Sequence, residues 1–489
     1  MRVGAGSVLP EDTRGGSSPR HESGRWQFVA RLGPAVIVSV GYMDPGNWAT
    51  DLEGGARFGY TLLWVLVASN AVALVLQVLS ARLGAAAGLD LAEACRRFYP
   101  PWMAVPLWLL AEVAMVACDL AELLGSAIAL HMLFRLPIVL GAILTAFDAF
   151  VLLALTGRRQ RLLEVVVALL VGAVSCCLGA ELVLSRPSSA EVVGGLVPRM
   201  PSDALYVAIG IVGATVMPHN LFLHSSLERA SGTDAGRRSP KSSLAATAVA
   251  LNAALLVNAS ILILSGAVFA RARYAVTDLD DARNLLAPLL GSSVAPVLFG
   301  IGLLLSGQSA TITSTLAGQI IMEGFVRVRL SPLLRRLVTR SLALVPALIV
   351  LTTRGGRGAT TLMITTQVIL SLELPFAVAP LVRFTGSANV MGRHANGLGT
   401  RAVAFGAAAL VTLSNAALIL HFLRAIPSAG WRGVLVFAAG LTTIFFAVLA
   451  FTPLRDPEAR SSPGRAGARP RRAPGGARWP CPLPRTKAE

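Results

Sequence analysis

Twelve long apolar stretches occupy most of this chain, and they restrict its fold more than any other feature. Each is about 20 residues or longer, the length that a helix needs to cross roughly 30 Å of hydrocarbon. Backbone groups in lipid must be paired within the segment, and these stretches are too long for barrel strands. The sequence therefore predicts an all-α membrane protein with about 11–12 transmembrane helices. The stretches lie near 31–57, 60–82, 103–133, 137–156, 162–184, 204–228, 244–270, 292–324, 336–353, 360–382, 401–423 and 432–453.

Composition supports this class and argues against others. With 54% hydrophobic and 14% charged residues, the chain is too evenly apolar for a soluble multidomain protein. Its formal net charge is +17, but the arginines lie between apolar stretches and in the tails, without an aromatic-rich basic patch. We therefore expect the lipid bilayer, and no nucleic acid, as its surroundings.

The arginines also predict the orientation. They cluster in alternate loops, as in Arg158, Arg159 and Arg161 after the fourth stretch. The positive-inside rule places these loops and both termini on the cytoplasmic side. We expect a multi-pass protein of the cell inner (plasma) membrane with a cytoplasmic N-terminus.

The two ends of the chain are polar. Residues 1–30 lack the apolar region of a signal peptide and are predicted to be a cytoplasmic N-terminal tail. Residues 454–489 are rich in Pro, Gly and Arg and are predicted to be a disordered basic C-terminal tail. Residues 31–453 between them form the predicted transmembrane domain. Whether the twelfth stretch is inserted, and hence the side of the C-terminus, stays open.

The first apolar stretch is interrupted at its middle by Asp44-Pro45-Gly46-Asn47. Proline removes a backbone donor and glycine is conformationally free, so a break in the helix is expected. A charge at mid-membrane costs about 2.5 kcal/mol or more, so Asp44 needs a compensating partner. The alternative is a proline-kinked helix in which Asp44 pairs with a neighbouring arginine.

The sixth stretch has a similar interruption, Met217-Pro218-His219-Asn220, near its midpoint. Transporters built from inverted repeats place a discontinuous helix at the same position in each half, facing the substrate site. The spacing of five stretches therefore predicts a 5+5 inverted repeat with discontinuous helices 1 and 6. The predicted repeats are about 31–184 and 204–382, with extra helices in about 401–453.

The residues at the two interruptions suit a transition metal. Asp44 supplies an anionic oxygen and Asn47 a neutral one, while the thioether of Met217 favours softer first-row metals over magnesium or calcium. The unwound backbone near Gly41 and Ala214 adds carbonyl oxygens. The mixture predicts a site for manganese, iron, cobalt or cadmium.

Titratable residues inside the third stretch are candidates for moving protons. Glu112, Asp119 and Glu122 lie among Ala, Val, Leu and Met, and the last two share a helix face at i and i+3. His219 could take up or relay a proton because an imidazole titrates near neutral pH. A hydrogen-bonded core histidine is the alternative for this residue.

The ninth and tenth stretches add further polar candidates. Arg336 and Arg340, one turn apart, are either counter-charges on an inward route or interface residues whose ends extend to water. In the tenth stretch Gln367 could offer an oxygen ligand, and Glu373 is a weaker candidate.

Three motifs together closely resemble the natural resistance-associated macrophage protein (Nramp) family. They are Gly-Tyr-Met-Asp-Pro-Gly-Asn at 41–47, Gly-Ala-Thr-Val-Met-Pro-His-Asn at 213–220 and Asp119-Leu-Ala-Glu122. The resemblance runs from about Arg31 to Leu420. It implies a LeuT-like fold with alternating access, and symport of Mn²⁺ or Fe²⁺ with protons, as in the bacterial members.

The resemblance also implies roles for residues. The metal ligands would be Asp44, Asn47, Met217 and the carbonyl of Ala214, with Gln367 joining in some states and the carbonyl of Gly41 in others. The proton route would use Asp44, His219, Asp119, Glu122 and the region of Arg336 and Arg340. Metal ions and protons would be substrates, and no cofactor or obligatory protein partner is expected.

Other functions remain alternatives. A magnesium or amino-acid carrier of the same fold would share the broken helices, and a membrane receptor could keep the fold without transport. A membrane enzyme is disfavoured because no nucleophile–base pair or phosphate-binding loop is found in the sequence.

Overall fold

The computed structural model describes residues 34–156, 160–231, 240–271, 279–328, 330–354, 357–425 and 429–455. Helices occupy all twelve apolar stretches. The first is a helical segment at 34–41 followed by α2 (Pro45–Phe58), and the sixth is α9 (Leu205–Val216) followed by α10 (Pro218–Ser231). The others are α3 (Leu63–Arg82), α5 (Pro101–Phe134), α6 (Ile138–Thr156), α7 (Gln160–Ser185), α11 (Pro240–Ser265), α13 (Ala295–Val326), α14 (Pro332–Arg354), α15 (Arg357–Gly386), α17 (Leu398–Ala425) and α18 (Ala429–Phe451).

Short elements join these helices. Two π-helical turns, η1 (Leu83–Ala87) and η3 (Gly266–Ala270), extend α3 and α11. The remaining elements are α4 (Leu91–Phe98), α8 (Ser189–Gly194), α12 (Leu279–Leu290), α16 (Ala388–Met391) and the 3₁₀ turn η4 (Gly392–His394). In the described ranges, eight spans are long and apolar enough to cross a bilayer. The interrupted first stretch, α6, α14 and α18 are helical but do not meet that criterion over their described lengths.

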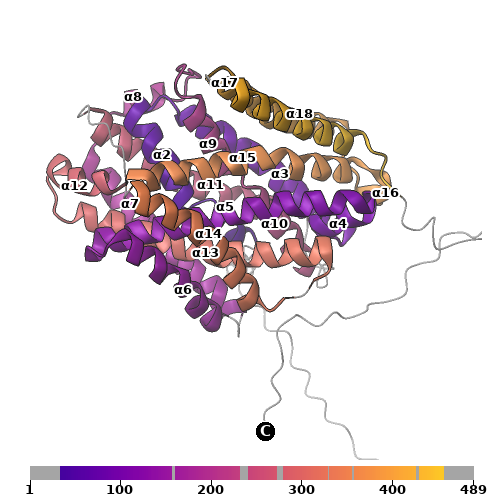
Figure 1. The fold of residues 1–489 in the computed structure, drawn as a ribbon, viewed down its shortest axis with the longest axis horizontal. Helices are drawn as coiled ribbons and strands as arrows, with labels where there is room; N and C mark the ends of the chain where they lie inside the picture. Colours follow the sequence, from indigo (N-terminus) through magenta and orange to yellow (C-terminus); the bar gives the residue numbers. More distant parts are fainter. Residues whose placement is uncertain are drawn as a thin grey trace, which may run out of the picture.

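The two halves pack as an inverted repeat. Helices at equivalent places in the halves touch each other, namely α3 with α11, α5 with α13, and α6 with α14. The contact of α7 with α13 has its counterpart in that of α15 with α5. Exchanging the halves therefore maps one set of contacts onto the other, as the predicted 5+5 LeuT-like fold requires. Helices α17 and α18 lie outside this core, along α15 at one edge of the molecule (Figure 1).

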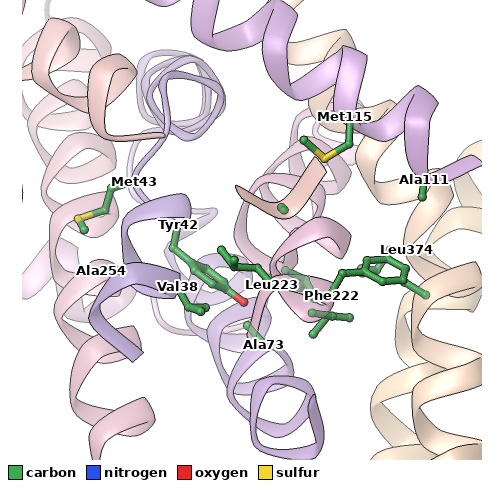
Figure 2. Close-up of a cluster of buried hydrophobic side chains, with 14 of the residues drawn as sticks. Val38, Tyr42, Met43, Ala73, Ala111, Met115, Phe222, Leu223, Ala254 and Leu374 are labelled. Atoms are coloured by element: carbon green, nitrogen blue, oxygen red, sulfur yellow. The ribbon is translucent and has the colours of Figure 1, made fainter. Parts of the chain in front are cut away.

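The interior is apolar and the outer faces are also apolar. Figure 2 shows buried side chains from several helices, among them Tyr42, Phe222, Leu223 and Leu374, which belong to one large core cluster. On the outside, α17 exposes large apolar residues such as Leu413, 68% of whose surface is accessible. A helix with apolar residues on its outer face is stable in lipid rather than in water. The chain is thus a multi-pass membrane protein.

Gly55 allows the closest approach between α2 and the end of α11. A Cβ at this position would overlap the carbonyl oxygen of Leu262 and would lie 2.6 Å from the Cβ of Ser265 and 2.9 Å from the amide nitrogen of Gly266. Two of these atoms belong to the backbone and cannot rotate away. The side chain of Ser265 also donates a hydrogen bond to the carbonyl of Leu52, so the two helices are held at this distance.

We expect Gly55→Ala to destabilise the folded protein by about 1–3 kcal/mol, the usual cost of overpacking a core. The measurement is the melting temperature of the full chain in detergent. The matched control is Gly179→Ala on α7, where an added Cβ meets nothing within 4 Å. Equal melting temperatures for the two variants would show that the close approach is not important for stability.

Candidate functional site

Each interrupted helix resumes at a proline. Pro45 and Pro218 are the first residues of α2 and α10, a position where the missing N–H of proline does no harm. In an unbroken helix these N–H groups would bond to the carbonyls four residues earlier, at Gly41 and Ala214. Proline therefore frees the two carbonyls that the sequence predicted as ligands. Met217, between α9 and α10, has φ 31° and ψ 104°, which redirects the chain at the break.

Asp44 and Asn47 link the first break to the second. Asp44 caps α2, and its Oδ1 accepts hydrogen bonds from the backbone N–H of Asn47 at 2.9 Å and from Asn47 Nδ2 at 2.8 Å. The same Nδ2 donates to the freed carbonyl of Ala214 at 3.1 Å. One amide NH₂ group thus lies between an anionic and a carbonyl oxygen from the two interrupted helices.

Asn258 on α11 supports this arrangement and was not predicted. Its Nδ2 donates to the carbonyl of Tyr42 in the first break at 2.7 Å and approaches Asn47 Oδ1 at 3.3 Å. Asn258 is buried on a helix that is otherwise largely apolar. An amide within a long apolar stretch is the signal that could have identified it, and Asn252 on the same helix carries the same signal.

Several oxygens beside the breaks are buried without a donor. Within the described residues, Asp44 Oδ2, Gln367 Oε1 and Asn220 Oδ1 have no hydrogen-bond partner, and all three side chains are 1% exposed or less. Gln367 on α15 lies directly over Gly46, where a Cβ would overlap its amide and would be 3.0 Å from Asp44 Oδ2. Buried polar atoms without partners are rare and require an explanation, such as a bound ion.

Met217 and Gly41 lie around Asn220. The Nδ2 of Asn220 is 3.6 Å from the sulfur of Met217, and a Cβ added to Gly41 would press on the same amide. Gly41, Asn47, Met217, Ala214, Asp44 and Gln367, the six predicted metal residues, are therefore all at the two breaks or in contact with them. Among the described residues, no three His, Cys, Asp or Glu side chains are grouped to hold a metal. A cation here would depend on one carboxylate together with amides, carbonyls and a thioether.

Asp119 and Glu122 on α5 form a buried ionic network with α14. Arg336 donates to Asp119 Oδ1 at 2.5 Å and to Glu122 Oε2 at 3.0 Å. Arg340 donates to the Asp119 carbonyl at 3.0 Å and lies 3.5 Å from Glu122 Oε2. Thr311 on α13 also donates to Glu122 Oε2 at 3.0 Å. The arginines are 2% and 3% exposed and are therefore counter-charges within the protein, not interface residues that extend to water.

A thiol lies between this network and His219. Cys118 Sγ is 3.4 Å from Glu122 Oε1 and 3.9 Å from His219 Nε2. His219 Nδ1 has no hydrogen-bond partner among the described residues, although the side chain is buried. The alternative of a hydrogen-bonded core histidine is met in part, by the contact of Nε2 with Cys118. Neither Cys118 nor Thr311 was among the predicted residues, because a thiol and a hydroxyl are unremarkable within apolar helices.

Glu112 lies in a separate ion pair. It accepts from Arg335 at 3.0 and 2.9 Å and from Trp108 at 2.9 Å, whereas Asp119 and Glu122 pair with the next arginine. A small pocket lies beside both pairs, with Asp119, Arg335 and Arg336 in its lining. Asp119 Oδ2 has no hydrogen-bond partner in the described part of the chain.

A third ionic cluster joins the last turn of α10 to the start of α4, which lies beyond the span that ends at Ala87. Arg229 bonds to Asp90 at 3.0 Å and also to Glu93, both near the start of α4. Burial raises the pKa of Asp90 above its ordinary value, and the nearby Arg229 opposes this effect. These contacts hold the end of α10 against the loop after α3.

Comparison with known proteins gives consistent matches. Residues 35–421 match the family described as "Natural resistance-associated macrophage protein-like". The "Divalent metal cation transporter MntH" of Xanthomonas campestris pv. campestris is 51% identical over 402 residues, which cover 79% of this chain and 90% of that protein. The protein of the same name from Nostoc sp. is 47% identical over 424 residues, or 85% of this chain and 96% of the relative.

Solved structures agree with these matches. The crystal structure of the Eremococcus coleocola manganese transporter superposes with a TM-score of 0.78 at 34% identity, covering 89% of this chain and 96% of that one. Mhp1, a nucleobase-cation-symport-1 family transporter, has a TM-score of 0.54 at 16% identity over 88% of this chain and shares only the fold. The sequence match over most of the chain and the two proline breaks lead to one conclusion: this protein belongs to the natural resistance-associated macrophage protein-like family.

Proposed function

We propose that this protein imports divalent transition metals such as Mn²⁺ and Fe²⁺ together with protons, by alternating access. The observation that carries the proposal is the set of buried acceptors at the two breaks. Asp44 Oδ2 and Gln367 Oε1 have no donors in the part of the chain that the structure describes, and the Ala214 carbonyl and the Met217 thioether lie at the same breaks. A cation satisfies such a set of acceptors, whereas a neutral amino acid would also need donors.

Rotation of one side chain would complete the site. The Asn47 NH₂ group now bonds to Asp44 Oδ1 and to the Ala214 carbonyl. Turning the amide by half a turn exchanges its nitrogen and oxygen, at the cost of the 3.3 Å contact that Asn47 Oδ1 makes with Asn258. The Asn47 oxygen would then face the same space as Asp44 Oδ1 and the Ala214 carbonyl oxygen. A divalent ion in that space would replace the NH₂ group as the partner of these oxygens.

Proton coupling is proposed to use the buried groups next to the metal site. A cation on Asp44 disfavours a proton on that carboxylate, so a proton must have another acceptor nearby. His219 follows Pro218 directly, and Cys118 lies between His219 and Glu122. Glu122 and Asp119, held by Arg336 and Arg340, lead to the pocket beside Glu112. Metal binding and proton release would thus occur on connected but separate groups.

The membrane placement is part of the proposal. The arginine clusters after even-numbered stretches support a cytoplasmic N-terminus and an inner-membrane location. With this orientation, α2 leads from the break toward the outside and α10 leads from its break toward the cytoplasm. The two breaks would then act as hinges, and the bond from Arg229 to Asp90 ties the end of α10 to the start of α4.

We expect Asp44→Asn to reduce Mn²⁺ uptake into proteoliposomes by at least about 100-fold, because it removes the only carboxylate among the proposed ligands. Uptake is measured with the purified full chain at neutral pH. The control is Asp203→Asn, the same chemical change on a side chain that is 65% exposed. If Asp44→Asn carries Mn²⁺ at the wild-type rate, or the wild type carries none, the proposal is wrong.

Met217→Ala should weaken the discrimination between metals. Without the thioether the site has only oxygen ligands, so Ca²⁺ and Mg²⁺ should compete with Mn²⁺ at lower concentration, by about tenfold. Competition assays with each ion provide the measurement, and Met391→Ala on α16, also buried, is the control. Unchanged selectivity would favour the alternative of a magnesium or amino-acid carrier.

Glu122→Gln should uncouple the two fluxes. The neutral amide cannot take up and release a proton, and it leaves Arg336 without one of its two carboxylate partners. Mn²⁺-driven acidification of the vesicle lumen should therefore fall more than Mn²⁺ uptake does. A pH-sensitive dye and a metal-sensitive dye in the same vesicles report the ratio. Glu323→Gln near the end of α13 is the control, and an unchanged ratio in Glu122→Gln would remove this residue from the proton route.

A further inference from the structure

Asp51 on α2 is a buried carboxylate that the metal and proton routes above do not use. Its side chain is 0% exposed, and neither carboxylate oxygen has a hydrogen-bond partner among the described residues. In that part of the chain no ion pair involves Asp51, whereas Asp119 and Glu122 are each paired with an arginine. A charged carboxylate without a partner is unstable in such surroundings, so Asp51 requires a proton or a cation.

The position of Asp51 on the helix connects it to the metal site. Asp44, Asn47 and Asp51 are spaced i, i+3 and i+7 and therefore lie along one face of α2. Seven residues correspond to about 10 Å along the axis. Asp51 is thus two turns beyond Asp44, toward the Phe58 end of the helix.

This face of α2 lies between α9 and α11. Asn47 contacts the carbonyl of Ala214 on α9 and the amide of Asn258 on α11. Four residues after Asp51, Gly55 packs against the end of α11 near Leu262. Asp51 therefore lies between two points of the same helix junction that holds the metal residues.

The carboxylates of Asp44 and Asp51 on α2 differ in their counter-charges from those of Asp119 and Glu122 on α5. Asp119 and Glu122 carry two negative charges and are matched by Arg336 and Arg340. Asp44 and Asp51 also carry two when ionised, but the described residues provide no arginine, lysine or histidine ion pair for either. A divalent cation that moves along this face would supply the missing counter-charge to each carboxylate in turn.

We propose that Asp51 is a second carboxylate on the cation route, which holds an arriving divalent ion on the outward side of Asp44 before it reaches the two breaks. This inference rests on the proposed function of metal import. A carboxylate on the entry path raises the local concentration of cations and so increases the rate of capture. It would act on capture of the ion and not on the maximal rate of the transport cycle.

The test measures Mn²⁺ uptake by the full chain in proteoliposomes as a function of Mn²⁺ concentration. Asp51→Asn should raise KM about tenfold while the maximal rate stays close to the wild-type value, because a local electrostatic attraction is lost. Asp51→Ser, smaller and also neutral, should behave in the same way, and Asp51→Glu should restore a low KM. The matched control is Glu181→Gln on α7, since Glu181 is also 0% exposed and its two oxygens have no hydrogen-bond partner within the described ranges, but it lies on another helix.

The outcomes are distinct. A wild-type KM in Asp51→Asn and Asp51→Ser, or a loss of maximal rate with KM unchanged, overturns the role of Asp51 and leaves the proposed function intact. An equal rise of KM in Glu181→Gln would likewise overturn it, because the effect would not depend on the Asp44 face. No Mn²⁺ uptake by the wild type would contradict the proposed function itself and this inference with it.

Discussion

Backbone hydrogen bonding in lipid is the constraint on which this structure depends. Within hydrocarbon every N–H and C=O must find a partner inside the protein, so an interrupted helix is tolerated only if other groups satisfy its ends. Here the two prolines each remove one donor and leave the carbonyls of Gly41 and Ala214 free. Asp44 satisfies the start of α2, and Asn47 reaches across to Ala214. The groups that stabilise the two breaks are therefore also the groups that can bind a cation.

Buried charge is managed in two ways in the same interior. On α5, Asp119 and Glu122 are paired with the counter-charges of Arg336 and Arg340 on α14. On α2, Asp44 has only amide partners and one oxygen with none. A buried carboxylate without a fixed counter-charge is stabilised by a bound cation, and this difference is the basis on which we propose Asp44, and not Asp119 or Glu122, as the metal ligand.

The sequence predicted the helices and the breaks well because both depend on local chemistry. Apolar length determines where a span lies, and a proline beside glycine or a polar side chain interrupts it at a definite residue. The limits differ by a few positions: α14 begins at Pro332, four residues before the expected 336. The extra turn carries Arg335, which the apolar pattern excluded and which pairs with Glu112. The short helices α4, α8, α12 and α16 were also not predicted, since they are too short or too polar to produce an apolar stretch.

The sequence by itself determined the class of fold, the two breaks and the residue types gathered at them. Tertiary structure decided which of these residues have partners. Asn258 supports Asn47, Cys118 separates His219 from Glu122, and Arg336 joins both acids, yet the partners in these contacts are between 4 and 217 residues apart in the chain. Asp51 reads in the sequence as one more polar residue near the first break, and only packing shows that it is buried without a counter-charge. The physical reason is that helix formation depends on neighbours along the chain, whereas the energy of a buried charge depends on neighbours in space.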